Sequence, residues 1–296
     1  MIISASRRTD LPAFYSRWFL NRLKEGFALV RNPFRPSIVT KVSLRREDVD
    51  CIVFWTKNPG PMLADLHPLR DFPYYFLFTL NPYAADLEAN LPAKPVLVET
   101  FRRLAGQIGG RKVIWRYDPI IFTDRTGPDY HRRNFEQLAA ALSPYTGKCI
   151  ISFLDFYAKT RKNTAHLSVF EPDMGLKRET AAAMAEIARG FGLKLETCAE
   201  DPDFTGLGID RAACIDGGLI REITGRDIAF RKDRNQRKAC GCAESADIGG
   251  YDTCRHCCVY CYANKIPDPR RRVPAHDPDS PLISGWAEAG DVIVEG

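Results

Sequence analysis

The sequence contains no long uninterrupted hydrophobic run, and nothing approaches the roughly 18 to 20 apolar residues that a membrane-spanning helix needs. The first residues, MIISASRRTD, become charged too early for the hydrophobic region of a secretory signal. The chain also lacks the phosphate loop G-x-x-x-x-G-K-[ST], the nucleophile elbow G-x-S-x-G and the zinc helix H-E-x-x-H. We therefore expect a cytoplasmic protein with no membrane segment and without these common hydrolase chemistries.

The composition is that of an ordinary globular protein, with 45% hydrophobic and 27% charged residues in 296. It excludes disorder, collagen and low-complexity arrays. We expect an α/β partial-barrel domain over residues 1–230 and a C-terminal cysteine-rich segment over 231–296 that packs on it. The net charge of +5 is small, and its excess lies in basic runs such as 231–238 and 270–272. These runs favour a solvated surface, and a nucleic-acid partner is allowed but not favoured.

One unit recurs along the chain: an apolar strand, a polar cluster at its carboxyl end, and then a helix. Continuous apolar strands that alternate with helices are typical of a parallel sheet covered by helices. The predicted strands are 2–5, 51–55, 75–78, 113–115, 149–153 and 193–196, and the predicted helices are 96–108, 130–142 and 177–190. Another helix is expected to open at Pro12 with Asp10 as its N-cap, and 27–31 with 38–42 read as an inserted hairpin.

Six strands suit a partial (β/α)6, TIM-like barrel, and a doubly wound open sheet is the competing arrangement. Either fold places the active site at the carboxyl ends of the strands. Polar side chains gather in the sequence at those ends: Arg7, Arg8, Asp10, Lys57, Asn58, Asn81, Arg116, Asp118, Asp155, Glu196 and Glu200. Each one alone reads as a cap or turn residue, but together they indicate a network that binds a polar ligand.

Six of the ten cysteines fall in one short C-terminal segment. Cys254, Cys258 and Cys261 have the spacing C-x3-C-x2-C, and three thiolates on one loop can hold three irons of a [4Fe–4S] cluster. Zinc is the rival, because Cys257 creates two overlapping C-x2-C pairs. Iron–sulfur is favoured, since the adjacent Cys257 and Cys258 cannot easily point at one ion. Cys240 and Cys242 could replace one of these pairs and restore the zinc interpretation, and a metal-free thiol cluster is the third alternative. His256 is expected to be a solvated loop residue.

The remaining cysteines leave several interpretations open. Cys240 and Cys242 form a C-x-C pair that could hold a second metal or auxiliary cluster with Cys257, act as a redox pair, or be structural thiols. Cys198, close to Glu196 at a strand end, is either a reactive thiol or hydrogen-atom donor, or an inert buried thiol. The other three cysteines, Cys51, Cys149 and Cys214, read as core residues.

The segment Cys-Arg-His-Cys-Cys-Val-Tyr-Cys-Tyr-Ala-Asn resembles the cluster loop of radical S-adenosylmethionine enzymes near the spore photoproduct lyase branch, although Cys257 stands where those loops commonly carry glycine. The whole chain resembles domain-of-unknown-function family 1848. That resemblance rests on the cysteine segment and on four further stretches: 4–10, 55–59, 116–119 and 276–282.

The resemblance implies a [4Fe–4S] cluster whose open iron binds S-adenosylmethionine, and a 5′-deoxyadenosyl radical that abstracts hydrogen from an unknown substrate, a small or anionic molecule. It implies an external electron donor such as a flavodoxin or ferredoxin. The residues expected near the bound S-adenosylmethionine are Arg7, Arg8, Lys57, Asn58 and Arg116, and the catalytic candidates are Cys198, Glu196 and Asp118.

The superfamily places its cluster loop after the first barrel strand, whereas here the loop follows the last recognisable strand–helix unit. A circularly permuted barrel would explain this order. The alternative function is a ligand-binding α/β domain with a structural zinc or iron–sulfur site and no radical chemistry.

Overall fold

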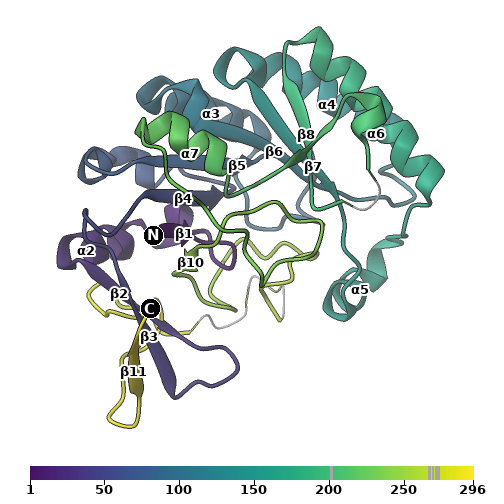
Figure 1. The fold of residues 1–296 in the computed structure, drawn as a ribbon. Helices are drawn as coiled ribbons and strands as arrows, with labels where there is room; N and C mark the ends of the chain where they lie inside the picture. The colour runs from purple at the N-terminus through teal and green to yellow at the C-terminus, as the bar shows by residue number, and fades with distance from the viewer. Residues whose placement is uncertain (201–202, 266–267, 269, 271–273) are drawn as a thin grey trace.

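The structure, a computed structural model, describes residues 1–200, 203–265, 268, 270 and 274–296 (Figure 1). Its main feature in these residues is an eight-stranded sheet of order β10-β1-β4-β5-β6-β7-β8-β9, in which every neighbouring pair is parallel. The strands are β1 Ile2–Ala5, β4 Cys51–Thr56, β5 Tyr74–Thr79, β6 Val113–Ile120, β7 Lys148–Phe153, β8 Lys194–Cys198, β9 Asp210–Ala212 and β10 Ala246–Asp247. The predicted α/β class is confirmed.

Helices connect most of these strands, as the alternating pattern predicts. The α-helices are α1 Leu11–Phe14, α2 Ser16–Glu25, α3 Lys94–Ile108, α4 Pro128–Leu142, α5 Ala158–Thr164, α6 Met174–Gly190 and α7 Gly217–Thr224. Short 3-10 turns cover Met62–Ala64, His67–Leu69, Gly110–Lys112, Ser143–Tyr145, Ala165–Leu167 and Thr205–Leu207. Asp10 caps α1, because its Oδ1 accepts a hydrogen bond from the backbone N–H of Ala13 at 3.0 Å. None of the helices in the described part of the chain combines the length and apolar character needed to cross a bilayer.

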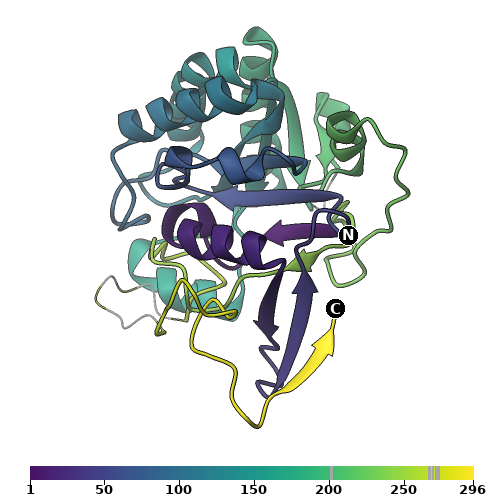
Figure 2. The same ribbon diagram turned by 90° about the vertical axis from the view of Figure 1, so that its left-hand side faces the viewer.

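The predicted hairpin insertion is confirmed: β2 (Phe27–Arg31) and β3 (Ile38–Ser43) pair antiparallel. A strand absent from the prediction, β11 (Val292–Glu295), pairs parallel with β3 and completes a small second sheet. Figure 2 shows this sheet projecting from the main body, with the C-terminus on its edge strand. The chain end therefore returns to the N-terminal part of the molecule.

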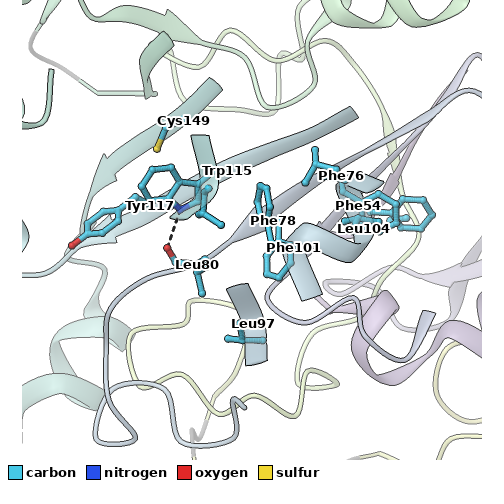
Figure 3. Packing of buried hydrophobic residues seen from close by; sticks show 14 of the residues in the cluster. Phe54, Phe76, Phe78, Leu80, Leu97, Phe101, Leu104, Trp115, Tyr117 and Cys149 are labelled. Atoms are coloured by element: carbon cyan, nitrogen blue, oxygen red, sulfur yellow. Dashed lines mark hydrogen bonds between the residues drawn. The ribbon is translucent and has the colours of Figure 1, made fainter. Parts of the chain in front are cut away.

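Side chains alternate between the two faces of the main sheet, as the period of a strand requires. One face carries the large aromatic core, in which Phe54 stacks on Phe76 at 4.5 Å and Trp115 stacks on Phe135 of α4 at 5.0 Å between ring centroids. The Trp115 indole N–H donates to the carbonyl of Leu80 at 3.0 Å (Figure 3). Helices α3, α4 and α6 supply the apolar side chains that cover this face.

The opposite face buries fewer apolar side chains and carries the polar residues at the ends of the strands. Its core is formed by Val53, Tyr75, Leu77, Ile114 and Ile150 together with Ile220 of α7. Because alternate residues share a face, Arg116 and Asp118 follow Ile114, and Ser152 follows Ile150, on this same side. The sheet thus has one face covered by the large aromatic core and a second face whose carboxyl end carries polar side chains.

Two strands of the main sheet escaped prediction. The strands β9 and β10 span three and two residues, too few to show hydrophobic alternation. They add one strand at each end of the predicted six, and within the described residues no pairing joins them. The edge strand β10 matters most, because the cysteine segment follows it directly.

Candidate metal-binding site

The loop that follows β10 interlocks with the loop that follows β1. Asp247 accepts hydrogen bonds from the Ser6 hydroxyl at 2.6 Å and from the backbone N–H of Arg7 at 2.9 Å. The two segments approach so closely at Gly249 that a Cβ there would lie 2.1 Å from Ser6 Oγ. A glycine is therefore required at this position, and the start of the cysteine loop is fixed against the carboxyl end of β1.

The cysteine loop then crosses the segment that follows β5. The backbone N–H of Val259 donates to the carbonyl of Leu87 at 3.1 Å, and the backbone N–H of Asn90 donates to the carbonyl of His256 at 3.1 Å. The Asn90 side-chain amide donates to the carbonyl of Arg255 at 2.8 Å. The loop is thus held over the carboxyl ends of β1 and β5, where the active site of a parallel sheet is expected.

His256 is part of this anchorage, and the expectation of a solvated residue is wrong. It is only 2% exposed, and its Nε2 lies 2.7 Å from Oδ2 of Asp10. The same carboxylate oxygen accepts the backbone N–H of Lys57 at 2.7 Å. Asp10 therefore caps α1 with one oxygen and joins the cysteine loop to the end of β4 with the other.

The thiols of Cys254, Cys258 and Cys261 are close enough to affect one another. Burial, and then the charge of Cys261, raises the pKa of Cys254 to about 12. Burial raises the pKa of Cys258 well above its usual range, which Lys57 lowers only in part. The pKa of Cys261 is also raised by burial, against hydrogen bonds from two backbone N–H groups. Three thiols enclosed in this way stay protonated unless a bound cation stabilises their thiolate forms.

Cys257 differs from the neighbouring cysteines in its backbone conformation and in its hydrogen-bond partner. Its φ of 56° lies in the left-handed region that favours glycine, which is the residue common here in the loops that this segment resembles. Its Sγ accepts a hydrogen bond from the Asn90 side-chain amide at 3.7 Å. The structure therefore supplies Cys257 with a local partner in the loop.

A buried ion-pair network lies beside these thiols, with Glu88 at its centre. The Lys57 and Lys94 ammonium groups each lie 2.7 Å from one of its carboxylate oxygens, and Tyr260 donates its hydroxyl proton at 2.5 Å. Burial alone would raise the pKa of Glu88, but the two lysines lower it to about 2. Sequence reasoning missed Glu88, because it follows a strand end by several residues and belongs to no motif.

A second group of thiols forms elsewhere, between residues that the sequence presents as scattered. The sulfur atoms of Cys198 and Cys214 lie 3.4 Å apart, and Cys242 and Cys240 continue the group. The interpretation of Cys214 as a bland core residue is incomplete, since it is buried but contacts other thiols. Among the residues that the structure describes, no three His, Cys, Asp or Glu side chains are already arranged as ligands of one metal ion.

These two thiol groups and the strand ends between them fall within one family match. The model of the family described as domain of unknown function (DUF1848) matches residues 2–263. The chain belongs to this family. The DUF1848 match covers all ten cysteines and confirms the family resemblance stated from the sequence. No curated protein and no solved structure matches the chain.

Within the DUF1848 region, some of the predicted cofactor residues already have hydrogen-bond or ion-pair partners and others do not. The Lys57 ammonium is held by Glu88, and Asn58 Oδ1 accepts the Gly60 N–H at 3.1 Å, as the turn interpretation expects. Arg8 lies 4.9 Å from the Tyr251 ring and lines a surface pocket of about 230 Å³.

The other two predicted cofactor residues, Arg7 and Arg116, present buried guanidinium nitrogens without a hydrogen-bond partner in the described structure, Nη2 of Arg7 and Nε of Arg116. Burial by itself would lower the pKa of Arg7. The combined effect of Cys242, Asp247 and Cys214 is larger and opposite, so the pKa is raised overall.

The three catalytic candidates, Asp118, Glu196 and Cys198, also lie in different environments. Asp118 hydrogen-bonds to Arg116 and accepts the Ser152 hydroxyl at 2.6 Å, at the carboxyl end of the sheet. Glu196 is instead committed to ion pairs with Lys148 at 2.8 Å and Lys194 at 2.9 Å. Cys198 belongs to the second thiol group.

The basic run 231–238 is mostly exposed, as a solvated surface would be, and its Arg237 pairs with Asp155 at 2.6 Å. In the second run, Arg270 is exposed, whereas Arg271 and Arg272 lie outside the described residues.

Proposed function

We propose that this protein is an iron–sulfur enzyme of the radical S-adenosylmethionine type. The observation that carries the proposal is the placement of Cys254, Cys258 and Cys261 on one loop, pinned over the carboxyl ends of β1 and β5. Parallel α/β folds bind their ligands at those ends. The substrate we propose is a small or anionic molecule, and the electron donor a flavodoxin- or ferredoxin-type protein.

The donor set fits a [4Fe–4S] cluster. Three soft thiols with the spacing C-x3-C-x2-C match three irons and leave the fourth free for a ligand. Burial raises the pKa of each thiol, so a positively charged group is needed to keep the thiolates in this enclosed place. When bound, such a cluster supplies the single electron that reductively cleaves a sulfonium.

The strand order supports a circularly permuted, partial TIM-like barrel. The edge strand β10 lies beside β1, and the cysteine loop follows β10 directly. If the sheet is read in spatial order from this edge, the cysteine loop comes after its first strand. That is the position of the cluster loop in the superfamily that the segment resembles, so the chain order alone differs.

The surrounding residues have separate roles in this proposal. Lys57, fixed by Glu88, provides positive charge beside Cys258, and its bound ammonium leaves it poorly suited to a cofactor carboxylate. Arg7 has a free buried Nη2, and the Tyr262 hydroxyl on the cysteine loop donates to the Arg7 carbonyl at 3.0 Å. We therefore assign recognition of the S-adenosylmethionine carboxylate to Arg7.

We assign substrate binding or proton transfer to Asp118, which is held by Ser152 and Arg116 on the same face of the sheet. Its partners fix the carboxylate in one orientation at the end of β6. Asp118→Asn would keep the shape and remove the charge.

The test is metal and sulfide analysis on full-length protein purified without oxygen, followed by an assay for S-adenosylmethionine cleavage after dithionite reduction. We expect about four irons per chain in the wild type and loss of iron and cleavage in Cys258→Ala. The matched control is Cys149→Ala, a buried core cysteine, which should keep both. Zinc in place of iron at this loop, or iron without cleavage, would overturn the radical mechanism and leave the alternative of a ligand-binding domain with a structural metal.

A further inference from the structure

Four cysteines from three separate segments meet on the functional face of the sheet. Cys198 ends β8, Cys214 follows β9, and Cys240 and Cys242 lie in the segment that precedes β10. Cys198 Sγ lies 3.4 Å from Cys214 Sγ, and the backbone N–H of Ile215 donates to Cys242 Sγ at 3.4 Å. Cys242 also exchanges hydrogen bonds with Cys214 and Cys240. The thiols thus form a row in the order 198, 214, 242, 240.

The two inner members of this row each contact two other thiols. Cys214 contacts Cys198 and Cys242, and Cys242 contacts Cys214 and Cys240. Four sulfur donors gathered in this way are a ligand set typical of zinc.

The cluster is separate from the three-cysteine loop. Cys214, Cys240 and Cys242 belong to the apolar cluster around β4, β5 and α7, whereas Cys258 belongs to another cluster around Tyr83 and Leu87. Each thiol group therefore has its own apolar surroundings, and a ligand of one does not account for the other.

The segment that carries Cys240 and Cys242 is irregular. Between the end of α7 at Thr224 and the start of β10 at Ala246 there is no helix or strand, and all residues here are described. A few backbone bonds hold it, such as Asp233 N–H to the Cys242 carbonyl at 2.9 Å and Ala243 N–H to the Ile215 carbonyl at 3.0 Å. A metal bound by four side chains is a common way to fix an irregular segment of this kind.

We propose that Cys198, Cys214, Cys240 and Cys242 are the ligands of a second metal site, for a single tetrahedral ion of the zinc class. The edge of a tetrahedron of sulfurs around such an ion, with zinc–sulfur bonds of roughly 2.3 Å, is about 3.8 Å. The observed contact of 3.4 Å between Cys198 and Cys214 is close to this edge. Binding closes the row, because Cys198 and Cys240 at its two ends must turn toward the same ion.

The charge around the cluster suits this assignment. Four thiolates and one divalent ion leave a net charge of about −2, which is costly in an enclosed place without counter-charges. Arg116 acts electrostatically on Cys198 and Cys214, and Arg7 acts on Cys214 and Cys242. These two guanidinium groups offset the charge of the filled site. The assignment stands whether or not the three-cysteine loop holds an iron–sulfur cluster.

The test is zinc and iron analysis of full-length protein produced with both metals present. We expect one zinc per chain in the wild type and in Cys258→Ala, and loss of zinc with retention of iron in the double variant Cys240→Ser, Cys242→Ser. Absence of zinc from the wild type would overturn the site. Iron and sulfide that disappear with Cys240 and Cys242 would overturn the single-ion assignment.

Because the double variant could fail to fold, a second measurement uses the wild type alone. Zinc-depleted protein is titrated with Co²⁺, and alkylation of each cysteine is followed by mass spectrometry. We expect a thiolate-to-cobalt absorption band and protection of all four thiols, Cys198, Cys214, Cys240 and Cys242, with no change at Cys51. Unchanged alkylation of the four thiols, or a Cys198–Cys214 disulfide that leaves cobalt unbound, would refute the site.

Discussion

Replacing Glu88 with glutamine should unfold the chain at a much lower denaturant concentration. The Glu88 side chain is 1% exposed and pairs with Lys57 and Lys94, both at 2.7 Å. Glutamine keeps the shape and one hydrogen-bond acceptor but removes the charge that compensates two ammonium groups. Lys57, which has a side-chain exposure of only 15%, would then be an uncompensated cation beside the three-cysteine loop.

The magnitude follows from the pKa of Glu88. The two lysines and their hydrogen bonds outweigh the effect of burial and lower it from 4.5 to about 2, which corresponds to about 3 kcal/mol of stabilisation. Breaking a buried ion pair by removing one partner costs about 3–5 kcal/mol, in agreement. Because the folded-state pKa is the lower one, this stabilisation is present above pH 4.5 and is lost as the pH falls toward 2.

The assay is urea unfolding of the wild type and Glu88→Gln at pH 7, with the protein in one metal state. We expect the variant to lose about 3 kcal/mol, and we expect Glu99→Gln, which removes an exposed partner of Arg102, to unfold at the wild-type midpoint. A Glu88→Gln variant that loses less than about 1 kcal/mol would refute the argument that Glu88 compensates two partly buried cations.

Three further outcomes follow from the structure. Cys257→Gly should keep the wild-type iron content, because the φ of 56° suits glycine; loss of iron would show that Cys257 is a ligand. Gly249→Ala should cost about 1–3 kcal/mol in urea unfolding, because its Cβ would meet Ser6, whereas Gly106→Ala in α3, which has open space, should be neutral or stabilising; equal effects would contradict this. Burial lowers the pKa of His131 from 6.5 to about 4, so stability is unaffected by this group above pH 6.5 and about 3 kcal/mol is lost as the pH falls from 6.5 through 4, because the unfolded chain binds the proton more readily; an unfolding free energy with the same pH dependence in His131→Gln would disprove it.

The fold class was predictable because the central strands are long and buried on both sides. The runs Cys51–Thr56 and Tyr74–Thr79 are buried throughout, are apolar up to their final threonine and are followed by polar turns, which is the signature of parallel strands. The edge strands β9 and β10 were not predictable, since they are defined by pairing with β8 and β1 rather than by their own sequence.

The candidate site was only partly predictable for a related reason. The spacing of Cys254, Cys258 and Cys261 carries its own chemical signal, because all three candidate ligands lie on one loop. The sequence around Cys198 and Cys214 contains no such spacing. The two residues come close to Cys242 only because β8 and β9 pair in parallel. Likewise, His256 resembles a solvated loop residue until the position of Asp10 is known. Local patterns reveal candidate residues that are close in sequence, whereas residues that are far apart in sequence are brought together only by tertiary contacts.

Electron paramagnetic resonance on the dithionite-reduced, full-length protein, with and without S-adenosylmethionine, tests the central claim most directly. A ligand that binds the iron left open by Cys254, Cys258 and Cys261 must alter the signal of the cluster. We predict a four-iron signal that shifts when S-adenosylmethionine is added and that is absent from Cys258→Ala. A cluster signal that is indifferent to S-adenosylmethionine, or a reduced protein with no cluster signal, would contradict the account.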